Sequence, residues 1–401
     1  MSRKTSGIFR LNIKQPNIIS LMILGAFASM GAIIMTPALP KIADFFGTRI
    51  GTTQFAVTSF LLGYAFGQLL YGPLANKYGR KFALYVGLVL ASVGSIFSIL
   101  SSPIESFQLL IFGRFLEALG ASAGLAISIT IINDFYFEEQ ARRVMTMLML
   151  AFSVVPGFAN AIGGSLVQYF GWRSCFYFLL LYGFALVFPT YRLAETLVAR
   201  DENALRKENI VRNFGEKFRN VKLVGFAMLA GLSGASIYVF GAEGPFIGIH
   251  LLHYQPSVYG LLALTPFIGM LIGNIISLRL SEIDPMIMIK ATFLLELLSA
   301  LAMLTCFLLH WINIYTLLIP MGLFAMGHPG LIATAVSMST RQLPDKANVS
   351  AVANFVMVSM PVAMTFLLSI LHASNAIVMP IIFLLALFFM VIIYVCIQRT
   401  K

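Results

Sequence analysis

The chain has 401 residues, of which 59% are hydrophobic and only 11% are charged, and its formal net charge is +11. A soluble domain carries about 25% charged residues, so this composition excludes an ordinary soluble protein. Apolar runs of about 20 residues, the length that crosses a bilayer core as a helix, recur along the chain. They indicate an all-α protein that spans the membrane many times.

Twelve membrane-spanning helices are predicted, and one long polar stretch separates them into two sets of six. We therefore expect an N-terminal six-helix bundle at 1–193, a cytoplasmic linker at 194–222 and a C-terminal six-helix bundle at 223–401. The predicted spans cover residues 18–40, 53–74, 82–101, 107–133, 144–170, 172–193, 223–251, 257–280, 286–310, 312–340, 347–371 and 376–397.

Most of the 27 lysines and arginines fall in loops on one side of the predicted membrane, the side that also holds both termini. Basic loops remain on the cytoplasmic side, so both termini are expected to be cytoplasmic. The positive charge follows from this topology and does not indicate a nucleic-acid partner. The expected partners are the lipid bilayer, a small-molecule substrate and protons, and the protein is expected to act as a monomer.

The chain lacks the residue patterns that would indicate an enzyme. Its three cysteines lie in different predicted spans, without the paired spacing of a disulfide framework or of a cysteine-based metal site. No HExxH, Walker or Rossmann pattern is present. We therefore expect no catalytic residue, no metal site and no cofactor.

A compact cluster of glycine, proline and positive charge, GQLLYGPLANKYGRKFAL, joins the second and third predicted spans. Gly72, Pro73 and Gly79 permit a tight reversal there, and glycines allow two helices to approach closely. Arg80 and Lys81 hold the loop on the cytoplasmic side.

This stretch resembles the signature loop of the major facilitator superfamily. Extended upstream to GYAFGQLLYGPLANKYGRK, it is similar to the bicyclomycin and chloramphenicol resistance (Bcr/CflA) subgroup of drug/proton antiporters. The segments PALPKIADFFG, GRFLEALGASAG and VPGFANAIGGSLVQYFGWRSCF carry the same resemblance. It implies two six-helix bundles around a central cavity lined by helices 1, 4, 7 and 10, which rock to expose the substrate to each side in turn.

In that family the signature loop latches helices 2 and 3 against helix 11. The family's aspartate is here Asn76, which keeps a hydrogen-bonding side chain but loses a negative charge near Arg80. Two interpretations stay open: a conformational latch weakened by this change, and a loop that only fixes topology.

Charged side chains inside membrane spans are costly to bury and usually face a cavity or a partner. Arg114 and Glu117 are three residues apart, on one face of the fourth predicted span, and Arg114 matches the arginine of the family's helix-4 motif. Glu117 either carries a proton during transport or forms a permanently ionised pair that only fixes helix packing.

Two further carboxyl groups lie in the C-terminal spans. Glu243 lies in GAEGPFIG, where Gly241, Gly244 and Pro245 predict a break in the helix. It either meets a cationic substrate or a proton, or lies wetted in an outer vestibule. Glu296 lies in a helix that is peripheral in the family, and a packing role is expected for it.

The chain also departs from the family at two positions. Ile33 stands where family members commonly have an acidic residue in helix 1. In the helix-5 antiporter motif, Pro156, Gly163 and Gly164 are retained, but Asn160 replaces the second proline. Two interpretations stay open: the coupling acid lies at Glu117 or Glu243, or the direction of transport differs from that of the family.

Apolar side chains on helices 1, 4, 7 and 10 could form an adaptable wall for varied ligands, although each could equally face lipid or pack between helices. His328 is either a titrating group or a neutral histidine that is hydrogen-bonded inside the bundle. The candidates for lining the cavity are Met30, Ile33, Phe115, Tyr238, Phe240, Met326 and His328.

The sequence therefore predicts a secondary active transporter of the bacterial inner membrane. Proton-coupled efflux of small amphipathic compounds, including antibiotics, is the leading expectation. Two alternatives remain: import or export of a specific metabolite or siderophore, and a transporter-like sensor or scaffold that moves nothing.

Overall fold

The computed structural model describes residues 15–280, 283–343, 346–371 and 375–399, and these ranges form helices and no strand. Twelve helical spans in them are long and apolar enough to cross a membrane. The predicted all-α fold with twelve membrane helices is confirmed.

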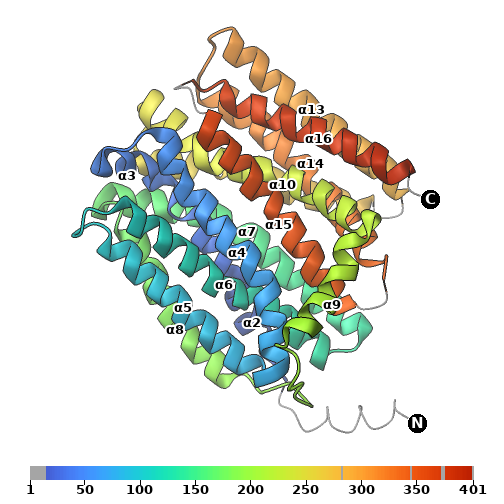
Figure 1. Cartoon of the computed structure of the whole chain (residues 1–401). Helices are drawn as coiled ribbons and strands as arrows, with labels where there is room; N and C mark the ends of the chain where they lie inside the picture. Colours follow the sequence, from blue (N-terminus) through green and yellow to red (C-terminus); the bar gives the residue numbers. More distant parts are fainter. Residues whose placement is uncertain (1–14, 281–282, 344–345, 372–374, 400–401) are drawn as a thin grey trace.

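The elements follow the predicted order of six spans, a linker and six spans (Figure 1). The first six spans are built from α2 (Ile18–Ile33), η1 (Thr36–Ala38), α3 (Leu39–Phe46), α4 (Ile50–Tyr78), α5 (Arg80–Leu100), α6 (Phe107–Phe135), α7 (Glu138–Phe170) and α8 (Ser174–Arg192). The linker contains α9 (Lys207–Arg219). The last six spans are built from α10 (Val221–Pro245), η2 (Phe246–Leu251), α11 (Pro256–Leu262), α12 (Thr265–Arg279), α13 (Pro285–Leu308), α14 (Ile314–Thr340), α15 (Lys346–Leu371) and α16 (Val378–Arg399).

Polar residues beside the apolar runs fix where several helices begin. The side chains of Asn17 and Ser106 accept hydrogen bonds from the first turns of α2 and α6. Asn220, Asp284 and Asn313 do the same for α10, α13 and α14. Each cap satisfies a backbone N–H group that has no partner within its own helix.

Glycines let the helices of the N-terminal half approach until their backbones touch. A Cβ added at Gly63 of α4 would lie 2.2 Å from the carbonyl oxygen of Phe115 in α6. One added at Gly120 of α6 would lie 2.2 Å from the backbone nitrogen of Ala91 in α5. Membrane helices depend on such close contact because lipid supplies no hydrophobic force between them. These contacts enclose the middle of α6 within the N-terminal six helices.

Figure 1 shows two distinguishable ends of the molecule. The helix α9, the start of α10 and the end of α16 lie at one end, which we name the linker end, and α3 lies at the opposite, far end. The linker helix α9 lies against the C-terminal half. Phe214 of α9 packs with Leu223 of α10 and Val352 of α15. The ring of Phe218 lies 5.8 Å from that of Phe355.

The predicted reversal between the second and third spans was placed too early. Helix α4 continues through Gly72 and Pro73 to Tyr78, and Gly79 alone separates it from α5. The predicted close approach at Gly72 is also wrong in this conformation, because a Cβ there would meet nothing within 4 Å. Hydropathy falls where α4 leaves the expected bilayer, but the helix itself does not end there.

The helix break predicted around Glu243 is also wrong. Helix α10 includes Gly241 and Gly244 and ends at Pro245. The chain then passes directly into a π-helical stretch, Phe246–Leu251. The wider π-helical turn accommodates the proline without interrupting the span, as π-bulges do inside α-helices.

Candidate functional site

The predicted pair on α6 is confirmed as an ion pair. Arg114 Nη1 lies 3.0 Å from Glu117 Oε2, and both side chains are fully buried. Arg114 Nη2 also donates a 2.8 Å hydrogen bond to the carbonyl oxygen of Gly31 in α2. The pair therefore joins α6 to the first membrane helix.

Aromatic rings and a glycine complete the surroundings of this pair. The guanidinium carbon of Arg114 lies 4.1 Å from the centre of the Phe60 ring of α4 and 5.9 Å from that of Phe176 in α8, within cation–π range. A Cβ at Gly31 would lie 3.3 Å from Glu117 Oε1. Among the described residues, Arg114 Nε and Glu117 Oε1 have no hydrogen-bond partner. The pair is thus held inside the N-terminal six helices.

Glu243 joins the two halves of the molecule. Its carboxyl group is buried and accepts a hydrogen bond from the side-chain amide of Gln54 in α4. A carboxylate wetted in a vestibule does not describe this conformation. Gln54 carries no distinctive sequence signal, because a polar residue in the first turns of a span is common.

The retained helix-5 motif forms a seam at the far end between the two halves, which we name the far-end seam. A Cβ at Gly164 of α7 would lie 2.3 Å from the carbonyl oxygen of Pro256 in α11, so the two backbones touch. The carbonyl oxygen of Asn160 lies 2.6 Å from the position of a Cβ at Gly260. Gly157, next to Pro156 inside α7, lies against α12.

Helix α7 also contacts the first span. A Cβ at Gly163 would lie 2.0 Å from the carbonyl oxygen of Ile34. Asn160 Oδ1 accepts a 3.3 Å hydrogen bond from the Thr36 hydroxyl. The residue that replaces the family's second proline therefore bonds to the first span, so its amide has a structural use that proline could not supply.

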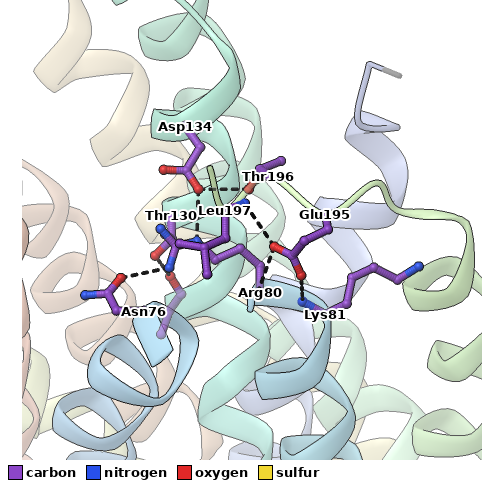
Figure 2. Close-up of polar contacts among 9 residues, drawn as sticks. Asn76, Arg80, Lys81, Thr130, Asp134, Glu195, Thr196 and Leu197 are labelled. Carbon is purple, nitrogen blue, oxygen red and sulfur yellow. Dashed lines mark hydrogen bonds and ion pairs between the residues drawn. The ribbon is translucent and has the colours of Figure 1, made fainter. Parts of the chain in front are cut away.

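At the linker end, the signature loop is part of a polar cluster (Figure 2). Arg80 Nε forms a 3.0 Å ion pair with Asp134 Oδ2, at the end of α6, and Nη1 donates a 2.8 Å hydrogen bond to Asn76 Oδ1. The hydroxyl of Thr196 donates to the same Asp134 oxygen at 2.8 Å. The expected contact between positions 76 and 80 is present, with asparagine as the acceptor.

Glu195 caps the third membrane helix from the start of the linker (Figure 2). Its two carboxylate oxygens accept hydrogen bonds from the backbone N–H groups of Arg80 and Lys81, at 3.0 and 3.1 Å. A carboxylate at a helix N-terminus satisfies free N–H groups and favours the helix dipole. The start of the linker is thereby fastened to the signature loop.

Gly79 is expected to be far less tolerant of substitution than Gly72. Its φ of +109° is a conformation that a side chain rarely adopts, and a Cβ there would lie 2.7 Å from Glu195 Oε2. Gly79→Ala should lower the free energy of unfolding by about 1–3 kcal/mol. Gly72→Ala, in a helix with open space around it, should leave stability unchanged or raise it by up to about 1 kcal/mol. Denaturant unfolding in detergent compares the two, and equal losses would contradict this account.

The residues expected to line a cavity lie on α2, α6, α10 and α14, and most of them are buried. Phe240 is buried. Ile33 lies at the far-end seam, where its Cδ1 is 3.7 Å from the position of a Cβ at Gly241. The ring of Phe115 lies 6.5 Å from that of Phe66 on α4, so it contacts the neighbouring helix.

The other cavity candidates also lie at different places in the fold. Met30 is buried and Tyr238 is partly buried. The carbonyl oxygen of Met326 lies 2.0 Å from the position of a Cβ at Gly273, where α14 packs on α12. His328 is hydrogen-bonded inside the C-terminal half. In the described part of the chain, no group of three or more His, Cys, Asp or Glu side chains could hold a metal ion.

Comparisons with known proteins agree with this architecture. The chain is 25% identical to a bicyclomycin resistance protein homolog of Haemophilus influenzae over 82% of both chains. It is 25% identical to multidrug resistance protein D of Escherichia coli over 82% of this chain and 83% of that one. The solved structure of a D-xylose-proton symporter superposes with a TM-score of 0.75 at 12% identity, covering 96% of this chain and 97% of that one.

The model of one protein family, described as Major Facilitator Superfamily, matches residues 21–359. Together with the twelve membrane helices, this makes the protein a multi-pass transporter of the bacterial inner membrane. The chain belongs to the major facilitator superfamily.

Proposed function

We propose that the protein exports small amphipathic compounds, antibiotics among them, in exchange for protons by alternating access. The names of two relatives, a bicyclomycin resistance protein homolog and multidrug resistance protein D, support this substrate class. The observation that carries the proposal is the far-end seam, whose backbone contacts between the two halves separate if the halves rock apart. The far end then faces outward and the linker end faces the cytoplasm.

Glu243 is the carboxyl group whose surroundings change with this motion. Its hydrogen bond to Gln54 crosses from one half to the other. Opening the far-end seam would break that bond and admit water to the carboxyl group. The hydrogen bond between Gln54 and Glu243 therefore depends on the position of the two halves.

An apolar groove supports amphipathic substrates. It has a volume of about 280 Å³ and lies between α4 and α15, with the side chain of Ser359 as its one polar lining group. Such a surface favours compounds that partition into the bilayer over sugars or ions. Its lining residues are Leu62, Ala65, Phe66, Phe355, Ser359, Val362, Ala363 and Phe366.

Transport of a specific metabolite or siderophore, inward or outward, is the second candidate. Ile33 favours it, because an apolar residue lies at the far-end seam where the drug-exporter subgroup commonly has an acid. In this case the same motion would serve a different substrate, and a pH gradient would drive uptake into vesicles of that compound and not of antibiotics.

Purified protein in proteoliposomes with an imposed pH gradient tests the proposal. Antibiotic accumulation should depend on the gradient and should fall by at least about tenfold, the equivalent of 1.4 kcal/mol, in Glu117→Gln if Glu117 carries the proton. Exchange of substrate without a gradient should persist in that variant. Glu243→Gln should mainly weaken the uptake of cationic compounds. A reversed pattern would assign coupling to Glu243, and siderophore transport without antibiotic transport would replace the proposed substrate class.

A further inference from the structure

A second buried acid lies in the C-terminal half, outside the proposed mechanism. Glu296 of α13 is fully buried, and its Oε1 accepts a 2.5 Å hydrogen bond from the hydroxyl of Ser233 in α10. Its other oxygen, Oε2, has no hydrogen-bond partner among the described residues. The packing role expected from the sequence does not explain a carboxyl group that leaves one oxygen unsatisfied.

Ser233 connects this acid to a histidine. Its hydroxyl oxygen lies 2.8 Å from Nδ1 of His328 in α14. A hydroxyl has one proton to donate, and when Glu296 is ionised this proton is donated to its carboxylate. The oxygen must then accept from Nδ1–H, which assigns the histidine tautomer from the bonding network. Three helices thus supply a continuous chain, Glu296–Ser233–His328.

No counter-charge lies in this chain of groups. The buried face of α16, which packs on α13, is apolar. On α13 itself, Lys290 is exposed, and the charged group of α12, which packs on α14, is Arg279 in its last turn. The described side chains of α15, which also packs on α14, carry no charge. The charged groups of α10, Lys222 and Glu243, lie near its two ends. His328 is therefore the titratable group that faces Glu296, and a bare carboxylate there would be expensive to bury.

We propose that Glu296, Ser233 and His328 form a proton-binding site in the C-terminal half. One proton enters at His328 Nε2, the Nδ1 proton passes to Ser233 Oγ, and the serine proton passes to Glu296 Oε1. The acid ends neutral and the histidine ends neutral with its proton on Nε2, so one proton is gained overall. His328 is the entry because it is 5% exposed, whereas Ser233 and Glu296 are both at 0%.

The two halves resemble one another at this position. In the N-terminal half, Gly31 of the first span lies beside Glu117; in the C-terminal half, Gly234 lies beside His328, whose Cε1 is 3.2 Å from the position of a Cβ there. Each half therefore keeps a glycine of its first helix against a buried polar cluster. The N-terminal cluster contains a cation, Arg114. The C-terminal cluster, formed by Glu296, Ser233 and His328, contains no such cation, and a bound proton would supply the positive charge.

Infrared difference spectroscopy between acidic and alkaline pH tests the site on purified protein in detergent. A protonated buried carboxyl band should appear in the unmodified protein and in Glu202→Gln, which changes an exposed linker residue. Glu296→Gln, a shape-conserving change, should remove the Glu296 component of this band, whereas any component from the buried Glu117 and Glu243 should stay. In Ser233→Ala and His328→Gln, the midpoint of the Glu296 component should move by about one pH unit or more. Either of these two variants suffices for the comparison.

An unchanged difference spectrum in Glu296→Gln would overturn the proposal and leave Glu296 as a packing residue. A midpoint that moves when sodium replaces choline in the buffer would overturn it as well, because the site would then bind a metal cation. That the bound proton drives transport rests on the proposed function, whereas proton binding at the site does not. The titration itself needs no substrate, so a failed antibiotic screen and a failed titration are distinguishable.

Discussion

Arg114→Gln is expected to lower the free energy of unfolding by about 3–5 kcal/mol and to abolish transport. The change leaves the buried Glu117 carboxylate without its cation and removes the hydrogen bond to the Gly31 carbonyl. It also removes the charge stacked on Phe60. Denaturant unfolding in mild detergent measures the loss of stability, and proteoliposome uptake measures transport.

The double variant Arg114→Gln/Glu117→Gln separates charge from packing. Two neutral amides can bond to one another, so much of the lost stability should return, and the double-mutant cycle gives the coupling energy of the pair. Arg173→Gln, at an exposed arginine, is the matched control and should change stability by no more than about 0.5 kcal/mol. A double variant as unstable as Arg114→Gln alone would show that the ion pair is not what stabilises this region.

Transport by the double variant decides between the two interpretations of Glu117. If the pair only fixes packing, the folded double variant should still accumulate substrate when a pH gradient is imposed. If Glu117 carries the proton, the double variant exchanges substrate but does not accumulate it. Neither outcome depends on the behaviour of Glu296, which lies in the other half of the molecule.

Short-range features of the fold were predictable from sequence, but the residues at which the helices end were not. Each membrane helix requires a long apolar run, so all twelve could be found. The contact of Arg114 with Glu117 follows from the helical repeat alone, since residues three apart share a face. The extension of α4 past Pro73 was missed because hydropathy reports the bilayer and not the last hydrogen-bonded turn.

Contacts between distant segments could not be derived from local patterns. Gln54 and Glu243 are 189 residues apart in sequence, and Arg80 and Glu195 are 115 apart. A weak signal existed for the second contact, because Glu195 is an acid placed just after a span that ends on the same side as the basic loop. For the first contact, only the packing of the two halves selects the partner.

A substitution in the far-end seam is expected to have the second large effect on transport. Gly164→Leu is expected to prevent the two halves from closing at the far end, because its Cβ would lie 2.3 Å from the backbone oxygen of Pro256, which cannot move without moving α11. Transport should fall by at least about tenfold. The stability of the protein should change little, because the halves can separate while each keeps its own packing.

A cysteine reporter at position 33 checks this expectation in a background that lacks Cys175, Cys306 and Cys396, the three free cysteines. Labelling by a membrane-impermeant reagent from the far side should rise in Gly164→Leu, because the side chain at 33 is buried in the closed seam. Gly215→Leu on α9 is the control, since a Cβ there meets nothing within 4 Å.

Gly163 differs from Gly164 in which half of the molecule it contacts. It neighbours Gly164 on the same helix, but its Cβ would lie 2.0 Å from the Ile34 carbonyl oxygen, within the N-terminal half. Gly163→Leu should therefore destabilise that half and lower the amount of folded protein, whereas Gly164→Leu should leave folding intact and change only the balance between conformations. Unchanged labelling and full transport in Gly164→Leu would mean that the seam at Pro256 does not open during the cycle.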